Sequence, residues 1–142
     1  MKITLRVKRL SEETKLPAYA YPGDAAFDLL AVEEAGLAPG ERKDIPTGLS
    51  IEIPEGYAGL IWDKSGIAIK NGVKVLGGVI DAGYRGEVRV GVVNLSEEPY
   101  VFEKGHKVAQ MIIQKIEQAD IVEVEELSET DRGGRGFGSS GK

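Results

Sequence analysis

The 142-residue sequence contains no cysteine and only one histidine, His106. Without cysteine the chain forms no disulfide, binds no metal through thiolates and has no cysteine nucleophile. A single histidine excludes a multi-histidine zinc site, and any Ser-His-Asp triad would depend on His106 alone. We expect His106 to lie at the surface. The chemistry is therefore expected from carboxylates, hydroxyls, amides and cations.

The sequence also lacks long apolar runs and any excess of positive charge. No run approaches the roughly 20 apolar residues of a membrane span, and the opening MKITLRVKRL has no uninterrupted apolar core typical of a signal peptide. The formal net charge is −5, which argues against a non-specific nucleic-acid binder. We expect a cytoplasmic protein that binds neither membranes nor nucleic acid, while a small anionic ligand is compatible with a few local basic groups.

Short segments of alternating apolar and polar residues are abundant, and turn sequences such as Asn71-Gly72 separate them. The alternation at Val88, Val90 and Val92 is typical of a strand with one buried face. The expected strands cover residues 3–8, 49–53, 59–62, 73–80, 87–93, 100–102, 108–116 and 121–124. Residues 73–80 are expected to pair with 87–93. The pattern predicts an all-β sandwich or barrel with one short helix at residues 65–70.

The last twelve residues, DRGGRGFGSSGK, differ in composition from the rest. Such a glycine-rich segment cannot bury enough apolar surface to offset its ordering entropy, so we expect it to be mobile in the free protein. The sequence therefore predicts a β domain at residues 1–130 and a tail at residues 131–142. The tail could become ordered over a ligand.

Several residues suit the binding of phosphate groups. Lys64, Ser65 and Gly66 open the expected helix, where N–H groups and the helix dipole favour an anion, although Ser65 could be an ordinary N-cap. Gln110 lies in an apolar strand, where a buried amide needs partners and could simply be a satisfied core residue. The tail offers forked donors and hydroxyls suited to phosphate, or it is a solvated terminus; these residues are Arg132, Arg135, Ser139 and Ser140.

Two acids and one aromatic residue add to this set. Asp81 could act as a general base, although an aspartate in a turn is usually only a turn residue. Tyr84 follows one short turn later and has a flat apolar face. Asp28 lies in an apolar run and needs donors or a cation nearby. The residues alone indicate a β protein that binds a phosphorylated small molecule, which Mg²⁺ commonly accompanies.

Five ordered motifs give a more specific resemblance. They are PGDAAFDLLA (22–31), WDKSGIA (62–68), GGVIDAGYRGEV (77–88), KGHKVAQMI (104–112) and RGGRGFGSSG (132–141). In this order the motifs resemble those of the trimeric dUTPase family, over nearly the whole chain. The resemblance implies a distorted jelly-roll or β-clip barrel that forms a homotrimer with active sites at subunit boundaries. It implies Mg²⁺-dependent hydrolysis of dUTP to dUMP and diphosphate, which limits uracil incorporation into DNA and supplies dUMP for dTMP synthesis.

The resemblance also implies a role for each matching residue. Asp81 would activate the water that attacks the α-phosphorus, and Tyr84 would pack on the deoxyribose. Backbone groups would read the uracil edge at Gly77, Gly78, Val79, Ile80 and Arg89. Phosphate contacts would come from Lys64, Ser65, Gly66 and Gln110. The tail residues Arg132, Gly138, Ser139 and Ser140 would close over the phosphates, with Phe137 stacked on the base. No residue would bind the metal directly, and Asp28 would lie near its water shell.

The chain departs from the family pattern at four positions. Lys64 and Lys107 replace arginines, His106 replaces an aspartate and Phe27 replaces a tyrosine. These changes suggest that an ion pair common in the family is absent or replaced. Two alternatives stay open: the related dCTP deaminases, which the Asp81/Tyr84 pair and the tail disfavour, and a non-catalytic nucleotide sensor on the same scaffold.

Overall fold

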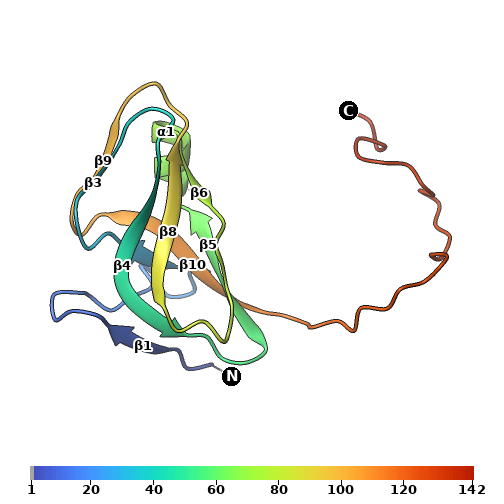
Figure 1. Ribbon diagram of the computed structural model, residues 1–142, viewed down its shortest axis with the longest axis horizontal. Coiled ribbons are helices and arrows are strands. Elements are labelled where there is room, and N and C mark those ends of the chain that lie inside the picture. Colours follow the sequence, from blue (N-terminus) through green and yellow to red (C-terminus); the bar gives the residue numbers. More distant parts are fainter. Residues whose placement is uncertain (1) are drawn as a thin grey trace.

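The computed structural model describes residues 2–142, and its regular elements are almost all strands (Figure 1). The elements are β1 (Arg6–Arg9), β2 (Phe27–Leu30), β3 (Ala35–Leu37), β4 (Arg42–Glu52), β5 (Tyr57–Asp63), α1 (Ser65–Asn71), β6 (Val73–Leu76), β7 (Val79–Ile80), β8 (Glu87–Asn94), β9 (Tyr100–Phe102) and β10 (Lys107–Lys115). The prediction of a mostly β protein with one short helix is confirmed. In the part of the chain that the structure describes, no helix has the length and apolar character needed to cross a bilayer.

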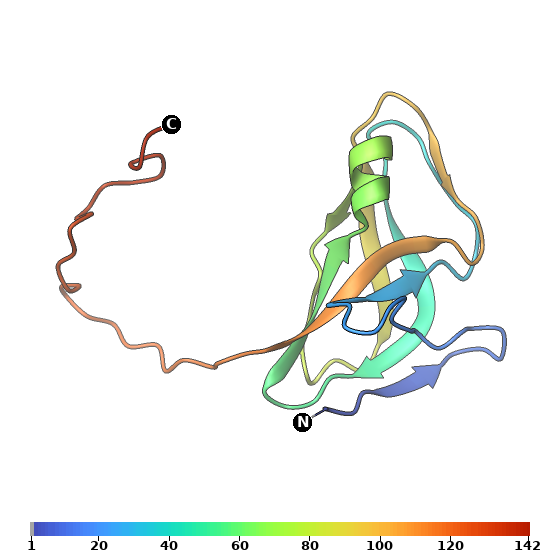
Figure 2. The same cartoon turned by 180° about the vertical axis from the view of Figure 1, so that it is seen from behind.

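The strands form two four-stranded sheets and one small pair, all antiparallel. One sheet has the order β1-β4-β8-β6, and the second, here called the site sheet, has the order β2-β10-β5-β7. The small pair joins β3 to β9. The view from behind shows α1 at one end of this body (Figure 2). Six of the eight predicted strands were found, although the first begins only at Arg6. The prediction at residues 73–80 is wrong in part and that at residues 121–124 is wrong, and β3 and the N-terminal half of β4 were missed.

The core lies between the two sheets. Val88, Val90 and Val92 are fully buried in β8, as their alternation predicts, and Ile45 and Ile51 of β4 are equally buried. Phe27, Leu29, Ile61, Ala109 and Met111 come from the site sheet. Burying one such aliphatic side chain contributes about 1.5–3 kcal/mol relative to leaving it exposed. This core fixes the strand register that places the functional side chains.

The prediction that residues 73–80 pair throughout with β8 is wrong in its second half. β6 pairs with β8, with Val75 opposite Val92, but β7 pairs with β5 in the site sheet. Between them Gly77 and Gly78 have φ angles of 68° and 116°. These left-handed values are readily available only to glycine, and they let the chain change from one sheet to the other.

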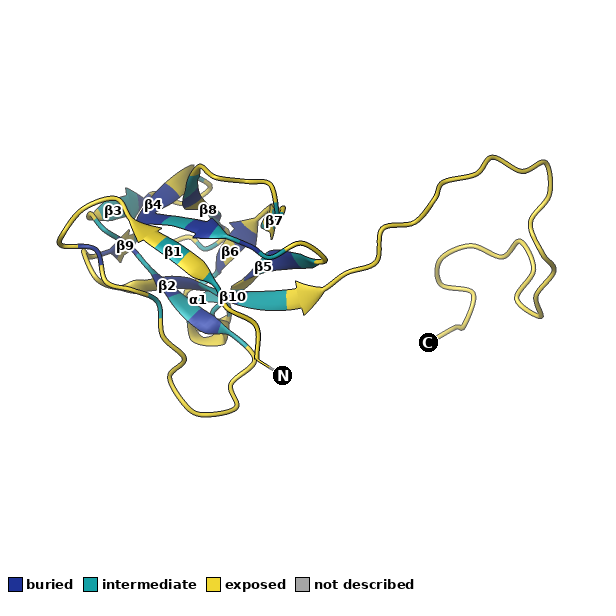
Figure 3. Ribbon diagram, turned by 90° about the horizontal axis from the view of Figure 1, so that it is seen from below, coloured by how far each residue is buried: buried dark blue, intermediate teal, exposed yellow. Residues whose placement is uncertain are grey.

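The predicted strand at residues 121–124 is also wrong. After β10 ends at Lys115 the chain runs away from the body, and every residue of that segment is exposed (Figure 3). The Ile121 side chain is 98% exposed. A strand needs a neighbouring edge to satisfy its N–H and C=O groups, and this segment lies against none within the chain. The boundary between domain and tail at residue 130 stays a prediction.

Candidate functional site

The outer face of the site sheet carries the residues expected to contact phosphate. Gln110 on β10 lies opposite Asp28 on β2 and opposite Trp62 on β5. Directly opposite residues of antiparallel strands share one face, so these three side chains form a row. The Gln110 amide donates to the Asp63 carbonyl oxygen at 2.8 Å, which supplies the partner that a part-buried amide needs.

This row forms part of a cavity of about 590 Å³. Lys64 and Ser65 reach it from the end of β5, and Ala26 and Asp24 reach it from the loop before β2. Figure 1 shows that α1 directly follows β5 at this end of the sheet. We call this space the phosphate cavity, because Lys64, Ser65 and Gln110, which the sequence assigned to phosphate, all line it.

The interpretation of Ser65 as an N-cap is wrong. Lys64 holds the cap position and makes no side-chain cap hydrogen bond, while Ser65 is the first helical residue. Ser65 and Gly66 are both exposed, and a Cβ at Gly66 would meet no atom within 4 Å. The hydroxyl and the first N–H groups of α1 are therefore free of intrachain side-chain caps.

Asp28 is the electrostatic centre of the phosphate cavity. Its carboxylate accepts from Lys64 Nζ at 2.7 Å and lies 3.1 Å from Lys107 Nζ. Burial on its own would raise the pKa of Asp28, but the hydrogen bonds from the two lysines outweigh it and hold the pKa below its ordinary value. The sequence-based expectation that Asp28 needs nearby cations is thus met by two lysines.

A second, smaller cavity of about 180 Å³ lies beside the sheet-switching glycines. Gly77, Gly78 and Val79 line it together with the edge of β5. The Gly78 carbonyl oxygen accepts from the Ile61 N–H at 2.8 Å, and a Cβ at Gly78 would lie 2.8 Å from the Ile61 carbonyl oxygen. Glycine is required here by both space and φ, so at Gly77 and Gly78 only main-chain groups border this space. We call it the glycine cavity.

Asp81 and Tyr84 lie at the hairpin that follows β7. The Tyr84 N–H donates to the Asp81 carbonyl oxygen at 3.1 Å, and the Tyr84 hydroxyl donates to the Glu87 carbonyl oxygen at 2.7 Å. A Cβ at Gly86 would lie 2.6 Å from the Tyr84 hydroxyl, so glycine makes room for the ring. The Asp81 side chain is exposed and has no hydrogen-bond or ion-pair partner within residues 2–142. Its carboxylate is available to water or a ligand.

Strand register separates this hairpin from the phosphate cavity within one chain. Ile80, directly before Asp81, lies opposite Gly59, whereas Lys64 follows the last residue of β5. The five residues from Gly59 to Lys64 correspond to roughly 16 Å along an extended strand. One chain therefore brings Lys64, Ser65 and Gln110 together, but it does not bring them to Asp81.

Arg89 and the tail residues, which were also predicted to contact the substrate, line neither cavity. The Arg89 guanidinium donates hydrogen bonds to the Asp44 and Glu87 carboxylates, and these contacts raise the pKa of Arg89. Because the side chain is engaged, the role predicted for Arg89, reading the uracil edge, falls to its main chain. The C-terminal tail runs away from the β body (Figure 1), and its predicted site residues are all exposed; they are Arg132, Phe137, Gly138, Ser139 and Ser140.

Sequence reasoning missed Asp63, which lines both cavities. Its carboxylate accepts from the Val75 N–H at 2.6 Å and from Lys74 Nζ at 2.8 Å. Burial opposes ionisation, but these donors hold the pKa of Asp63 below its ordinary value. An acid at the end of the apolar run Leu60-Ile61-Trp62 was the available signal. Asp63 ties the end of β5 to β6, and hence to the glycines that follow.

The described residues do not form a metal site on their own. Among residues 2–142 no group of three or more histidine, cysteine or acidic side chains could hold a metal ion. Both oxygens of Asp28 face lysines. A divalent cation that reaches this cavity would therefore need ligands from the phosphates of a substrate and from water.

A sequence model of the dUTPase family matches residues 12–141, which is nearly the whole chain. The chain belongs to the dUTPase family. This membership agrees with the five motifs and confirms the family prediction. It also confirms the prediction of an enzyme, since the matching curated relatives carry the name deoxyuridine 5'-triphosphate nucleotidohydrolase.

The dUTPase relatives cover this chain almost completely. The one from Clostridium tetani is 49% identical over 141 residues, which are 98% of this chain and 97% of that relative. The one from Clostridium kluyveri is 48% identical over 139 residues, which are 96% of this chain and 97% of that relative. No large segment of either relative lies outside the matched region.

Solved dUTPase structures share the fold. Staphylococcus bacteriophage 80alpha dUTPase, as a variant with dUpNHpp, has a TM-score of 0.93 and 32% identity, covering 99% of this chain and 100% of that chain. A variant of the dUTPase from phage phi11 of S. aureus, described with a structural Mg(II) ion, has a TM-score of 0.83 and 29% identity, covering 89% of this chain and 100% of that chain.

The departures from the dUTPase motifs have local partners. Lys64 and Lys107 share Asp28, while His106 lies 3.3 Å from the Glu103 carboxylate and accepts from the Glu103 N–H. Lys64 and His106 therefore do not pair with each other. In this chain the two residues belong to two separate sets of contacts.

Proposed function

We propose that this chain hydrolyses dUTP to dUMP and diphosphate. The observation that carries the proposal is the Asp81 carboxylate, which is exposed and has no partner within residues 2–142. It lies one turn before the Tyr84 ring, at the tip of a hairpin. The glycines Gly77 and Gly78, which carry no side chain, precede this hairpin. The hydrolysis would limit uracil incorporation into DNA and supply dUMP for dTMP synthesis.

The reaction is a displacement by water at the α-phosphorus. Asp81 holds the water and accepts its proton while the water oxygen bonds to phosphorus. The bond from the α-phosphorus to its bridging oxygen breaks, and the electron pair leaves with diphosphate. A carboxylate suits this role because the attacked phosphorus is already polarised by the cations around the triphosphate.

Main-chain groups around the glycine cavity read the uracil ring. The N–H and C=O groups of Gly77, Gly78, Val79 and Ile80, with the main chain of Arg89, match the donor–acceptor edge of uracil, which cytosine does not share. The narrow hairpin excludes the thymine methyl group, and the Tyr84 face excludes a ribose 2′-OH. The phage 80alpha structure with the analogue dUpNHpp supports a uridine nucleotide as the ligand.

The triphosphate occupies the phosphate cavity as its Mg²⁺ complex. Lys64, Ser65, Gly66 and Gln110 contact its oxygens. Among residues 2–142 no cluster of acidic or histidine side chains could hold the ion, so its ligands would come from the phosphates and from water. The magnesium ion would neutralise phosphate charge. The tail residues Arg132, Gly138, Ser139 and Ser140 close over the phosphates, with Phe137 on the base.

We further propose that three copies of this distorted jelly roll assemble into a homotrimer with sites at subunit boundaries. Two observations support this arrangement. By register, Ile80 before Asp81 lies opposite Gly59, and the stretch from Gly59 to Lys64 alone spans roughly 16 Å along β5 within one chain. The outer face of the site sheet also exposes apolar side chains, with Trp62 54% and Val79 67% exposed, and such a face favours a protein partner.

The test is release of diphosphate from a panel of nucleotides with Mg²⁺ present. We expect release from dUTP and at least about a hundredfold less from dCTP, because cytosine would leave main-chain donors and acceptors unpaired. dTTP and UTP serve as controls for the methyl group and the 2′-OH. Equal release from dCTP, or deamination of dCTP, would contradict the proposal, and binding without release would favour a nucleotide sensor.

A further inference from the structure

Lys107 shares the carboxylate that holds Lys64. Lys107 Nζ lies 3.1 Å from one Asp28 oxygen and Lys64 Nζ lies 2.7 Å from the other. The Asp28 side chain is only 13% exposed, whereas Lys107 is 55% exposed, so the acid is fixed and the cation reaches solvent. Both oxygens of the acid are thus engaged by cations from two elements, Lys64 at the cap of α1 and Lys107 on β10.

A β-bulge places Lys107 on this face. The pairing of β10 with β2 shifts between Lys107 and Ala109, and both Val108 and Ala109 are buried. In a regular strand Lys107 would share the inward face of Ala109. The bulge reverses this alternation, so that Lys107 joins Asp28 and Gln110 on the outer face.

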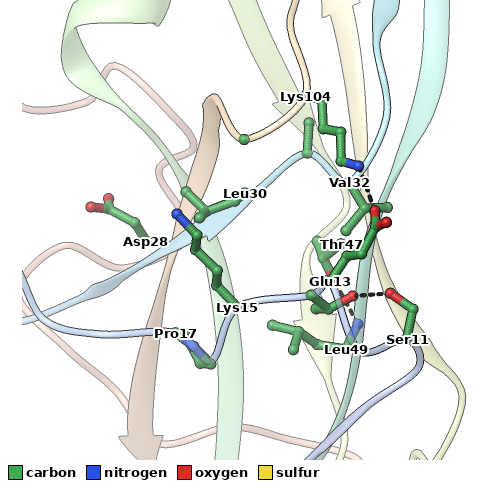
Figure 4. A pocket seen from close by; sticks show the side chains of 13 residues that line it. Ser11, Glu13, Lys15, Pro17, Asp28, Leu30, Val32, Thr47, Leu49 and Lys104 are labelled. Atoms are coloured by element: carbon green, nitrogen blue, oxygen red, sulfur yellow. Dashed lines mark hydrogen bonds and ion pairs between the residues drawn. The ribbon is translucent and has the colours of Figure 1, made fainter.

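The cluster carries more positive than negative charge. Two ammonium groups face one carboxylate, which leaves one positive charge in excess. In Figure 4 the Asp28 carboxylate points away from the Lys15 side chain, so the cations that engage this acid are Lys64 and Lys107. A lysine is a point charge on a flexible stem, so an anchoring acid reduces the freedom that it would lose on binding an anion.

We propose that Lys107 is a second phosphate-binding cation, and that Asp28 is a positioning residue that holds Lys64 and Lys107 toward the triphosphate. This inference rests on the proposed function. The sequence-based prediction that Asp28 lies near the water shell of the metal is the alternative role, and the contact of each oxygen with a lysine favours positioning. Two anchored lysines would supply positive charge to the triphosphate from two sides of one acid.

The decisive variant is Lys107→Ala, measured by calorimetric binding of Mg²⁺ and dUpNHpp to the full-length protein. We expect about a tenfold or greater loss of affinity and a smaller dependence of affinity on salt concentration, because one charged contact is removed. Lys107→Arg should restore most of the affinity. Lys104→Ala is the matched control: Lys104 lies on the same turn but pairs with Glu13, and its loss should leave binding unchanged.

Asp28→Asn tests whether Asp28 positions the two lysines or lies near the water shell of the metal. If Asp28 positions the lysines, the variant should have a raised KM and an unchanged Mg²⁺ concentration for half-maximal activity. Its rise in KM should not add to that of Lys107→Ala when the two substitutions are combined. A shifted Mg²⁺ requirement would overturn the positioning role, and wild-type affinity in Lys107→Ala would overturn the phosphate contact. Wild-type protein that neither binds dUpNHpp nor cleaves dUTP would instead overturn the proposed function itself.

Discussion

Asp81→Asn is expected to bind dUTP with nearly wild-type affinity and to lose about a thousandfold in kcat. The amide has the shape of the carboxylate and can still hold a water, but it cannot accept a proton from that water. Because Asp81 is exposed and has no intrachain side-chain partner, the substitution should leave the fold intact. Single-turnover kinetics with dUTP, together with the Kd for dUpNHpp, measure the two effects separately.

The control for this variant is Asp120→Asn, which removes an exposed acid from the segment after β10. Its kcat should equal that of the wild type. Turnover by Asp81→Asn within a few fold of the wild type would remove Asp81 from the role of base. An equal loss in affinity and in kcat would instead assign it to ground-state binding.

Removal of residues 132–142 is expected to reduce kcat/KM by about a hundredfold or more and to leave the protein folded. The deleted segment buries no side chain, and the hydrogen bonds from Arg132 and Arg135 go to carbonyl oxygens of the tail itself. Its loss therefore removes donors for the phosphates and a cover for the site without touching the core. Thermal unfolding and steady-state kinetics measure the two expectations.

The single substitution Phe137→Ala provides a graded control. It keeps the phosphate donors and removes only the ring proposed to stack on the base, so its loss in kcat/KM should be smaller than that of the deletion. A truncated protein with the full wild-type rate would show that the tail is no lid. A lowered unfolding temperature would show that the tail supports the fold.

Local patterns predicted the features that depend on local physics. The alternation of Val88, Val90 and Val92 gave a buried strand face, and the short helix after Lys64 was found with its end one residue longer. Gln110 was recognised as an amide in need of a partner, and it has one. In each case the deciding contacts lie within the element or across one strand pair.

Features that depend on pairing between distant segments were not predictable. Nothing in the order of residues 73–80 shows that β7 leaves its neighbour β8 for β5, because the decision rests on the φ angles of Gly77 and Gly78. The lysine pair at Asp28 depends on a bulge, which reverses one alternation without a sequence signal of its own. The strand expected at residues 121–124 lacked a neighbouring edge.

The roles of the candidate residues came from motif resemblance, and the structure adds where each one lies. Physical reasoning alone could leave Asp81 as a turn aspartate, since the sequence does not show whether its carboxylate is paired. The separation of Asp81 from Lys64 also follows only from register. It is this separation that makes a site shared between subunits the central claim.

Subunit complementation tests that claim most directly. One parent carries Asp81→Asn and the other carries Lys64→Ala with Gln110→Ala, and the two are refolded together in equal amounts. If each site takes Asp81 from one subunit and the phosphate cavity from another, about a quarter of the sites regain both intact sets, with activity to match. Activity no greater than the average of the two parents would contradict a shared site.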